Sequence, residues 1–389
     1  MRLSDRMHRL KTESAFVVLA KAKELERQGR DIIHLEIGDT DFDTPSVIIE
    51  EAYSQLKAGQ THYCPSAGLL DLREACCKSL GRDGRGDYGP DEIVIGPGGK
   101  PFLYYAIMAL VGPGDEVIYP DPGFPVYESV TLYAGAKAVP LPILEENDFR
   151  FTAGDLRSRV TDRTRLIILN YPHNPTGGTL ARYELEAIAE IAIEGDIIVL
   201  SDEVYAHMLF EGEHVSIGVI PGMKERTILL ETFSKTYAMT GWRLGFAAAP
   251  AELAESLAQI ITNSVSCVPP FIQLAGAKAL LADQSESEAM MVDFRRRRDL
   301  FVSGLNEIDG ISCKYPDGAF YAFPNVGSLP MKAEPLADFL MEDAGVATLP
   351  GSAFGIHADS HLRMCFANST ENLERALDRI SEAVGKLPT

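Results

Sequence analysis

Between about residue 90 and residue 250, the chain alternates short apolar, β-rich runs with longer segments of helical periodicity. Runs that are apolar throughout are typical of strands buried on both faces of a sheet. Five strands are predicted in this way: Glu92 to Ile95, Glu116 to Tyr119, Leu166 to Asn170, Ile197 to Ser201 and Thr227 to Glu231. The segments between them, such as Pro101 to Val111 and Leu180 to Glu194, are predicted as helices. Because parallel strands need crossover connections, the alternation predicts an α/β fold: a parallel sheet with helices on both faces.

The two ends of the chain have a different pattern. Ser14 as a cap, an amphipathic stretch to Gln28 and Gly29 as a stop predict a helix near the start. About the last hundred residues mix short apolar runs with helical segments, which predicts a smaller α+β domain. We expect the opening helix to pack on this smaller domain.

Composition limits the classes of partner. The chain has 389 residues and a formal charge of −20, which disfavours binding to the phosphate backbone of nucleic acids. We expect the run Arg295 to Arg298 to be a solvated helix face. No segment approaches the length of an apolar membrane span, and the six cysteines show no CxxC spacing. We therefore expect a cytoplasmic protein that binds neither nucleic acid nor membrane.

Two nucleotide motifs and one metal motif are incomplete. The segment from Gly96 to Lys100 follows a strand, but a Walker A loop needs Gly at Val94 and Ser or Thr at Pro101, and the dinucleotide-binding fingerprint needs Gly at Pro101. Its glycines still predict a helix N-terminus that can bind an anion such as phosphate. His357 and His361 are four residues apart without the Glu of an HExxH motif, so we predict no metal site.

Polar residues gather just after three predicted strands. These residues are Asn174, Asp202, Tyr205, Lys235 and Arg243. In open parallel sheets, ligands bind at the carboxyl ends of the strands, so these side chains are expected to meet in one crevice. Each has an alternative structural role, such as a turn for Asn174 or a helix cap for Asp202. Their clustering at successive strand ends favours a catalytic site.

Motifs over nearly the whole chain resemble the class I pyridoxal-phosphate aminotransferases of fold type I, which include aspartate aminotransferase. In the order of the family they are Ile37-Gly38 before Asp41-Phe-Asp-Thr-Pro45, Tyr63 before Gly68 and Leu72-Arg73, Gly98-Gly99-Lys100, Asn174-Pro-Thr-Gly177, Asp202-Glu-Val-Tyr205, Ser234-Lys235, Gly241-Trp-Arg243, Gly318-Ala-Phe-Tyr321, Leu349-Pro-Gly351 and Arg363. The resemblance implies a mostly parallel, seven-stranded sheet in a large domain, and a homodimer with active sites at the subunit interface. It also implies a small domain built from both chain ends, which we assign to residues 1–45 and 281–389, with the large domain at 46–280.

The resemblance also implies catalytic roles for the clustered residues. Lys235 is expected to form a Schiff base with the cofactor pyridoxal 5′-phosphate and then to move a proton between the substrate Cα and the cofactor. Asp202 is expected to face the pyridine nitrogen and keep it protonated. Tyr205 and Asn174 are expected to bind the ring oxygen and tune the pKa of the Schiff base.

The cofactor phosphate is expected to bind the amides of Gly98, Gly99 and Lys100, with help from the Thr232 hydroxyl and the Arg243 guanidinium. These five residues form the predicted phosphate site.

The remaining cofactor and substrate contacts are also implied by the resemblance. Tyr63 is expected to reach the phosphate from the other subunit. Phe124 is expected to stack on the ring, where many relatives carry Trp or Tyr. Arg363 is the expected clamp for the substrate α-carboxylate, with Gly38 and Asn174 beside it.

The implied reaction moves an amino group from an amino acid to a 2-oxo acid, most often 2-oxoglutarate. Lys100 favours acidic side chains, whereas Phe16, near the entrance, favours apolar or aromatic ones, so we expect a broad specificity that includes acidic substrates. The alternative is a carbon–sulfur β-lyase, which would use the same Lys235, Asp202 and Arg363. A regulatory protein on this fold would need an added DNA-binding domain, for which the chain has neither spare length nor a basic patch.

Overall fold

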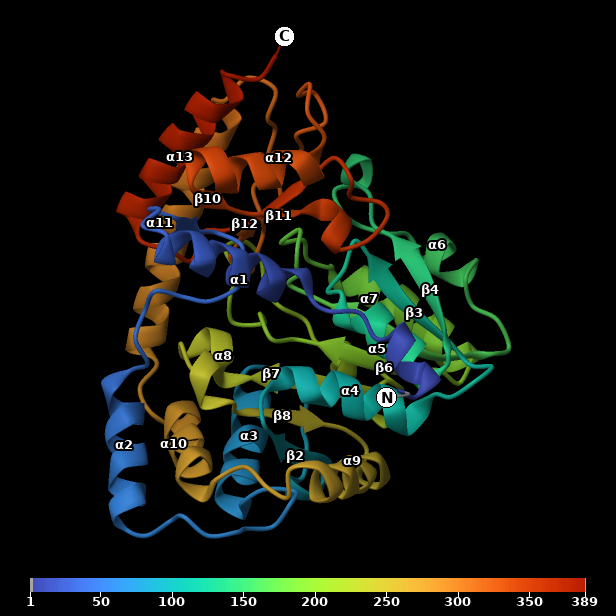
Figure 1. Cartoon of the computed structure of the whole chain (residues 1–389). Helices are drawn as coiled ribbons and strands as arrows, with labels where there is room; N and C mark the ends of the chain where they lie inside the picture. The colour runs from blue at the N-terminus through green and yellow to red at the C-terminus, as the bar shows by residue number, and fades with distance from the viewer. Residues whose placement is uncertain (1–2, 389) are drawn as a thin grey trace.

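A seven-stranded sheet forms the centre of the computed structural model, which describes residues 3–388 (Figure 1). Its strand order is β2-β8-β7-β6-β5-β3-β4. The strands are β2 (Ile93–Gly96), β3 (Glu116–Asp121), β4 (Lys137–Pro142), β5 (Thr164–Asn170), β6 (Ile198–Asp202), β7 (Thr227–Thr232) and β8 (Gly245–Ala248). All neighbouring pairs are parallel except those that β8 makes with β2 and β7, which are antiparallel. The prediction of an α/β fold with a mostly parallel sheet is confirmed.

All five strands predicted from the sequence are present, but two further strands were not predicted. β4 is an edge strand and contains Pro140 and Pro142, which weaken the sequence signal for a strand because proline cannot donate a hydrogen bond to a neighbouring strand. β8 consists of one glycine, one phenylalanine and two alanines, so it lacks the β-branched residues that mark the other strands.

Helices cover both faces of the sheet because the strand residues alternate between them. In β5, Leu166 and Ile168 pack into one apolar cluster with helices α4 (Gly99–Leu110), α5 (Val126–Ala134) and α9 (Ala251–Ser264). Ile167 and Leu169 pack into the opposite cluster with α6 (Ala153–Arg157) and α7 (Arg182–Glu194). On that second face, under β2 and β8, lie α2 (Ser46–Lys57), α3 (Leu70–Arg82) and α10 (Pro270–Leu281).

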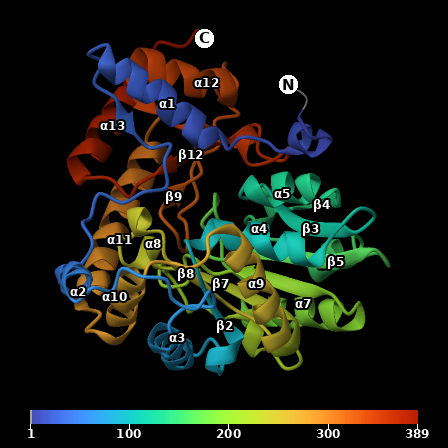
Figure 2. The same ribbon diagram turned by 60° about the horizontal axis from the view of Figure 1, so that its bottom comes forward.

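The two chain ends come together in two small sheets. β1 (Ile33–His34) pairs in parallel with β10 (Val346–Ala347), while β12 (Leu362–Cys365) lies between β11 (Leu349–Pro350) and β9 (Tyr321–Ala322). Four helices accompany them: α1 (Ser14–Arg27), α11 (Ser285–Asn306), α12 (Ala333–Phe339) and α13 (Thr370–Val384). As expected, α1 lies beside the C-terminal elements (Figure 2), and Lys21 forms an ion pair with Asp338 of α12 at 2.8 Å.

The opening helix begins one residue away from the predicted cap. Glu13 is the N-cap residue of α1 and Ser14 is already helical. At the other end the expected stop is confirmed, because Gly29 has a φ of +86°. Short 3-10 turns elsewhere join the main elements without altering this arrangement.

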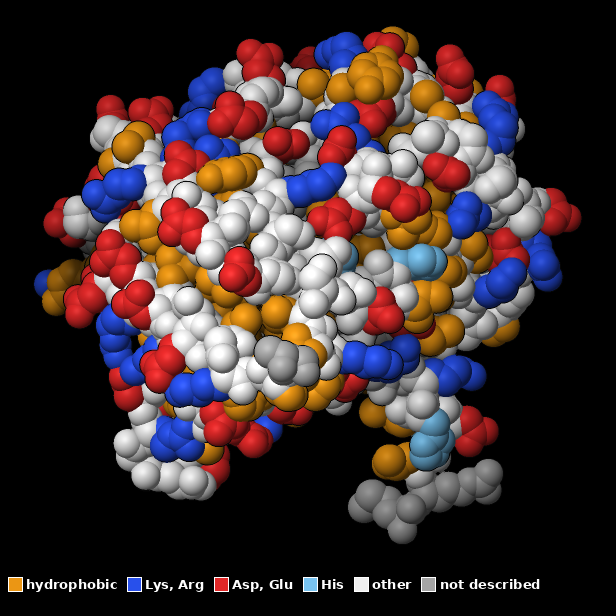
Figure 3. Space-filling view, turned by 90° about the horizontal axis from the view of Figure 1, so that it is seen from above, with side chains coloured by type: hydrophobic (Ala, Val, Ile, Leu, Met, Phe, Trp, Pro, Cys, Tyr) orange, Lys and Arg blue, Asp and Glu red, His pale blue; other side chains and the backbone are white. Residues whose placement is uncertain are grey.

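The prediction of a solvated arginine face is wrong for half of the run. Arg295 and Arg296 are exposed, but Arg297 and Arg298 are buried in α11. Arg297 is paired with Asp41 at 2.5 Å, so its charge is compensated where the two chain ends meet. Figure 3 shows acidic and basic side chains interspersed over the face formed by the C-terminal elements. Within residues 3–388, no helix combines the length and apolarity needed to cross a bilayer.

A buried ion network lies under the carboxyl ends of β6 and β7. Arg85 is buried between the carboxylates of Glu203, at 2.9 Å, and Glu231, at 2.5 Å. Glu203 also accepts hydrogen bonds from Ser201 and Ser216, so both of its oxygens are used. Because Glu203 follows β6 and Glu231 lies in β7, the network fixes the ends of these two strands relative to each other.

Replacing Arg85 should destabilise the fold strongly. In Arg85→Met, two buried carboxylates lose their counter-ion, and we expect the free energy of unfolding to fall by about 3–5 kcal/mol. Urea unfolding of the wild type and the variant measures this change. The matched control is Arg157→Met, whose exposed pair with Glu194 should contribute less than about 1 kcal/mol. Equal effects of the two substitutions would contradict the assigned role of Arg85.

Candidate active site

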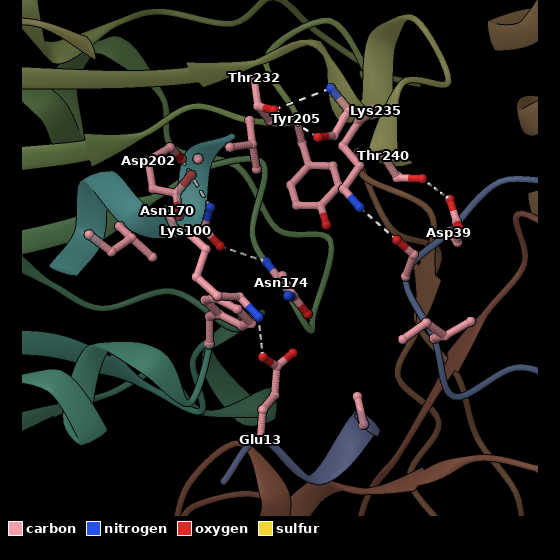
Figure 4. A pocket seen from close by; sticks show the side chains of 18 of the residues that line it. Glu13, Asp39, Lys100, Asn170, Asn174, Asp202, Tyr205, Thr232, Lys235 and Thr240 are labelled. Carbon is pink, nitrogen blue, oxygen red and sulfur yellow. Dashed lines mark hydrogen bonds and ion pairs between the residues drawn. The ribbon is translucent and has the colours of Figure 1, made fainter. Parts of the chain in front are cut away.

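A cavity of about 560 Å³ lies where the carboxyl ends of β5, β6 and β7 meet the N-terminus of α4 and the small sheets (Figure 4). This size suits a small organic ligand. Most of the predicted site residues line it: Gly38, Gly99, Lys100, Phe124, Asn174, Asp202, Tyr205, Thr232, Lys235, Arg243 and Arg363. Phe16 also lines the cavity. The expectation that these residues meet in one crevice is therefore confirmed.

Two predicted residues are placed differently. Gly98 precedes the lining residue Gly99 and is the N-cap of α4, so it can act only through its backbone. Tyr63 does not line the cavity of its own chain, and 88% of it is exposed. Its predicted contact with the site of another subunit is not tested within a single chain.

Asn170, at the end of β5, organises the loop that carries Asn174. Its side-chain amide donates to the Asp202 carbonyl at 2.9 Å, and its side-chain oxygen accepts from the Asn174 backbone N–H at 2.9 Å. One buried side chain thus ties the β5 loop to the end of β6. The sequence analysis missed Asn170 because it counted this residue as part of the strand.

Asp202 is a buried carboxylate with only half of its hydrogen-bonding capacity used. Tyr127 of α5 donates to Oδ2 at 2.7 Å, while Oδ1 has no hydrogen-bond partner among residues 3–388. Burial raises the pKa of Asp202 to about 7, and the hydrogen bond from Tyr127 opposes this shift. The arrangement suits a ligand that donates a hydrogen bond to Oδ1. Tyr127 was not predicted, because a tyrosine in an apolar helix is usually part of the core.

Lys235 lies in the short helix α8 (Phe233–Thr236), directly after β7. Its Nζ donates a hydrogen bond to the Gly38 carbonyl at 2.6 Å. Burial lowers the pKa of Lys235 to about 8. A lysine with this pKa is partly deprotonated near neutral pH, so it can act as a nucleophile and as a general base.

The hydroxyl of Tyr205 forms a hydrogen bond with that of Tyr321, a third residue that the sequence analysis did not assign to the site. Their hydroxyl oxygens are 2.8 Å apart, and burial raises the pKa of Tyr205 well above its usual value. A Cβ added to Gly38 would lie 2.1 Å from the Tyr321 hydroxyl. Gly38 therefore has to be glycine for the chain to pass this close to the pair.

The turn before α4 has the chemistry of an anion site. Gly98 has a φ of +90°, and a Cβ there would lie 2.4 Å from Nη2 of Arg243. The hydroxyls of Thr232 and Ser234 are 2.8 Å from each other and also line the cavity. A helix N-terminus, two hydroxyls and a guanidinium together suit a phosphate group.

Arg363 is a buried guanidinium between two aromatic rings. Its carbon lies 4.4 Å from the ring centre of Tyr321 and 4.9 Å from that of Phe354. Its nitrogens donate to the Asn174 side-chain oxygen at 3.4 Å and to the Glu36 carbonyl, and Nε has no partner among residues 3–388. Because these acceptors are neutral, the buried charge suits a carboxylate ligand.

The two histidines considered for a metal pair with carboxylates instead. His357 lies 3.3 Å from Asp121, and His361 lies 3.1 Å from Glu145. In the described part of the chain, no group of three or more His, Cys, Asp or Glu side chains is arranged to hold a metal ion.

Comparisons with known proteins identify the family of the chain. The family described as "Aminotransferase class I and II" matches residues 30–380. The aspartate aminotransferase of Musicola paradisiaca (strain Ech703) is 37% identical over 385 residues, which cover 98% of this chain and 96% of that protein. The aromatic-amino-acid aminotransferase 2 of Thermococcus litoralis is 38% identical over 388 residues, which cover 99% of this chain and 98% of that protein. The structure of Thermus thermophilus aspartate aminotransferase with maleate matches with a TM-score of 0.93 and 37% identity, and the match covers 98% of this chain and 100% of that chain.

The fold and the cavity define an α/β enzyme of fold type I. The chain belongs to the class I and II aminotransferase family, because the family match covers most of its length. It is a transaminase that depends on pyridoxal 5′-phosphate, as the sequence predicted.

The pKa of Asp202 predicts a pH-dependent stability of the cofactor-free protein. A folded-state pKa of about 7, against an ordinary value of 3.8, means that the folded protein keeps a proton that the unfolded chain releases. The contribution of Asp202 to stability therefore falls as the pH rises from about 4 to about 7. Asp202→Asn removes this pH dependence. As the pH rises from about 4 to about 7, the free energy of unfolding of the variant should therefore increase by about 2–4 kcal/mol relative to that of the wild type. Urea unfolding of both proteins between pH 4.5 and pH 8 measures the difference, and a pH-independent difference would contradict the assignment.

Proposed function

We propose that this transaminase transfers an amino group from an amino acid to 2-oxoglutarate, with Lys235 as the reacting amine. The observation that carries the proposal is that one cavity contains both Lys235 and Asp202 (Figure 4). Lys235 has a lowered pKa, and Asp202 has a buried oxygen without a partner in the described chain. An amine that can react and a carboxylate that can hold a ring nitrogen are the two requirements of this chemistry.

The residues fit the cofactor at both of its ends. Bound pyridoxal phosphate supplies an electron-withdrawing ring that stabilises negative charge at the substrate Cα. Asp202 would hold the proton of the ring nitrogen at Oδ1, the atom that has no other partner. The amides at Gly98, Gly99 and Lys100, with Thr232 and Arg243, would hold the phosphate.

The other lining residues would orient the ring and move the proton. Tyr205 and Asn174 would donate hydrogen bonds to the ring oxygen, and Phe124 would cover the ring face. Lys235 would take the proton from the substrate Cα at Nζ and deliver it on the same side of the ring. Tyr321 would fix the direction of the Tyr205 hydroxyl through their hydrogen bond.

The substrate α-carboxylate would bind Arg363. Its fork of parallel N–H groups matches a carboxylate, and its burial between two rings limits the orientations that the ligand can take. Gly38 and Asn174 would border the same position, since both line the cavity and Asn174 already contacts Arg363.

We further propose two domains, at 46–280 and at 1–45 with 281–389, in a cytoplasmic homodimer. Apolar clustering supports the division, because one large core joins β9, β12, α11 and α13 apart from the cores on the two faces of the seven-stranded sheet. Exposed apolar side chains on α2, in the segment after it and at the start of α3 support the dimer. They are Ile49, Tyr53, Leu56, Tyr63 and Leu70.

The half-reaction without an acceptor tests the assigned chemistry. Wild-type enzyme loaded with cofactor should convert up to about one equivalent of amino acid per subunit to its oxo acid and then stop. Lys235→Ala should form no oxo acid at a rate comparable to that of the wild type. The measurement is oxo acid released in a rapid-quench assay, with 2-oxoglutarate added afterwards to restart turnover. Continuous release of pyruvate and ammonia from cystathionine without any acceptor would instead support the β-lyase alternative.

Hybrid dimers test whether Tyr63 acts across the subunit boundary. A hybrid of Tyr63→Ala and Lys235→Ala subunits would contain one site with both residues intact if Tyr63 serves the partner. Such a hybrid, isolated with two affinity tags, should show about half of the wild-type activity per dimer. If Tyr63 serves its own subunit, the hybrid cannot exceed half of the activity of the Tyr63→Ala homodimer.

A further inference from the structure

Lys100, predicted to bind acidic side chains, already has a carboxylate partner from the start of the chain. Its Nζ donates a hydrogen bond to the carboxylate of Glu13, and both residues line the cavity (Figure 4). Glu13 is the N-cap residue of α1, where a carboxylate ordinarily accepts a hydrogen bond from the first helical turn. Its side chain makes no such bond. The side chain is directed instead toward the lysine across the cavity.

The surroundings of this ion pair are apolar. The Lys100 Nζ lies 5.1 Å from the ring centre of Phe16 and 5.3 Å from that of Phe124. Ala15, Leu19 and Leu103 also line the cavity. An uncharged substrate side chain therefore has aromatic and aliphatic surfaces to contact, and it meets a lysine whose charge is already neutralised.

We propose that Glu13 determines the substrate class by competing with the distal carboxylate of acidic substrates for Lys100. This inference rests on the proposed function of the site. With an uncharged or aromatic donor, the Glu13–Lys100 pair stays closed and forms a neutral wall. With aspartate, glutamate or 2-oxoglutarate, the distal carboxylate replaces Glu13 on Lys100. Lys100 thus exchanges one carboxylate for another, and the number of charges that it pairs with does not change.

The exposure of the pair makes this exchange feasible. The Glu13 side chain is 20% exposed and that of Lys100 is 42% exposed, so water reaches both groups. Ion pairs with this exposure contribute little to stability and exchange partners readily. When displaced, Glu13 remains at the N-terminus of the 14-residue helix α1, where the helix dipole favours a negative charge. The site therefore offers the released carboxylate an alternative favourable position.

Removing the competitor should favour acidic substrates. For Glu13→Gln, we expect the ratio of kcat/KM for aspartate to that for phenylalanine to rise about tenfold. In a Lys100→Met background, the same substitution should leave the ratio unchanged, because Glu13 acts through Lys100. The matched control is Glu128→Gln, since Glu128 pairs with Lys11 of the same N-terminal segment outside the cavity. That control should not alter the ratio.

Ligand binding gives a second measurement that needs no turnover. Calorimetry on the cofactor-loaded enzyme compares succinate, which has two carboxylates, with 3-phenylpropionate, which has one. Glu13→Gln should lower the Kd of succinate about tenfold relative to that of 3-phenylpropionate. An unchanged ratio in both assays would overturn the role of Glu13 and leave the proposed function intact. A wild-type enzyme that transaminates neither aspartate nor phenylalanine would count against the proposed function, while succinate binding would still decide the role of Glu13.

Discussion

Asp202 is kept away from water without a cationic partner among residues 3–388, and much of the surrounding structure follows from that constraint. A buried carboxylate is costly unless other groups hold it in place. Tyr127 donates to one oxygen, Asn170 binds the backbone of the same residue, and Arg85 neutralises the two glutamates that would otherwise repel its charge. These contacts fix the carboxyl end of β6, and they leave the second oxygen of Asp202 free for a ligand that would bring its own positive charge.

The sequence predicts the site well wherever a residue follows a central strand. Asp202 and Lys235 come after apolar runs that leave no alternative to a buried strand, so their positions follow from the sheet. Tyr127 and Tyr321 were missed because they lie within apolar segments, where a tyrosine is not distinguishable from core. β8 was missed because its short, small side chains have no strand signal, and Arg297 was misplaced because its partner, Asp41, lies far away in the sequence. Pairings between distant segments are what one sequence does not reveal.

In the proposed mode of binding, the two ends of a dicarboxylate substrate would meet environments of different rigidity. Arg363 is buried and stacked between aromatic rings, whereas Lys100 is partly exposed and held by one flexible carboxylate. The α-carboxylate and the amino group are common to all amino acids, so a rigid site for these groups does not restrict the range of substrates. The side chain is what differs between donor and acceptor, and the proposed exchange of the Glu13–Lys100 ion pair would allow one cavity to accept both.

Several contacts of the site also join the seven-stranded sheet to the elements from the chain ends. Lys235 binds the Gly38 carbonyl, Thr240 binds Asp39, Arg363 reaches Asn174, and Lys100 binds Glu13. In three of these contacts, those of Lys235, Arg363 and Lys100, at least one partner is a group that the substrate or the cofactor would use in the proposed function. Ligand binding would therefore replace direct contacts between the sheet and the elements from the chain ends by contacts that each part makes with the ligand. Because each exchange alters how the two parts of the chain are held together, substrate recognition and the relative position of these parts are coupled by the same few side chains.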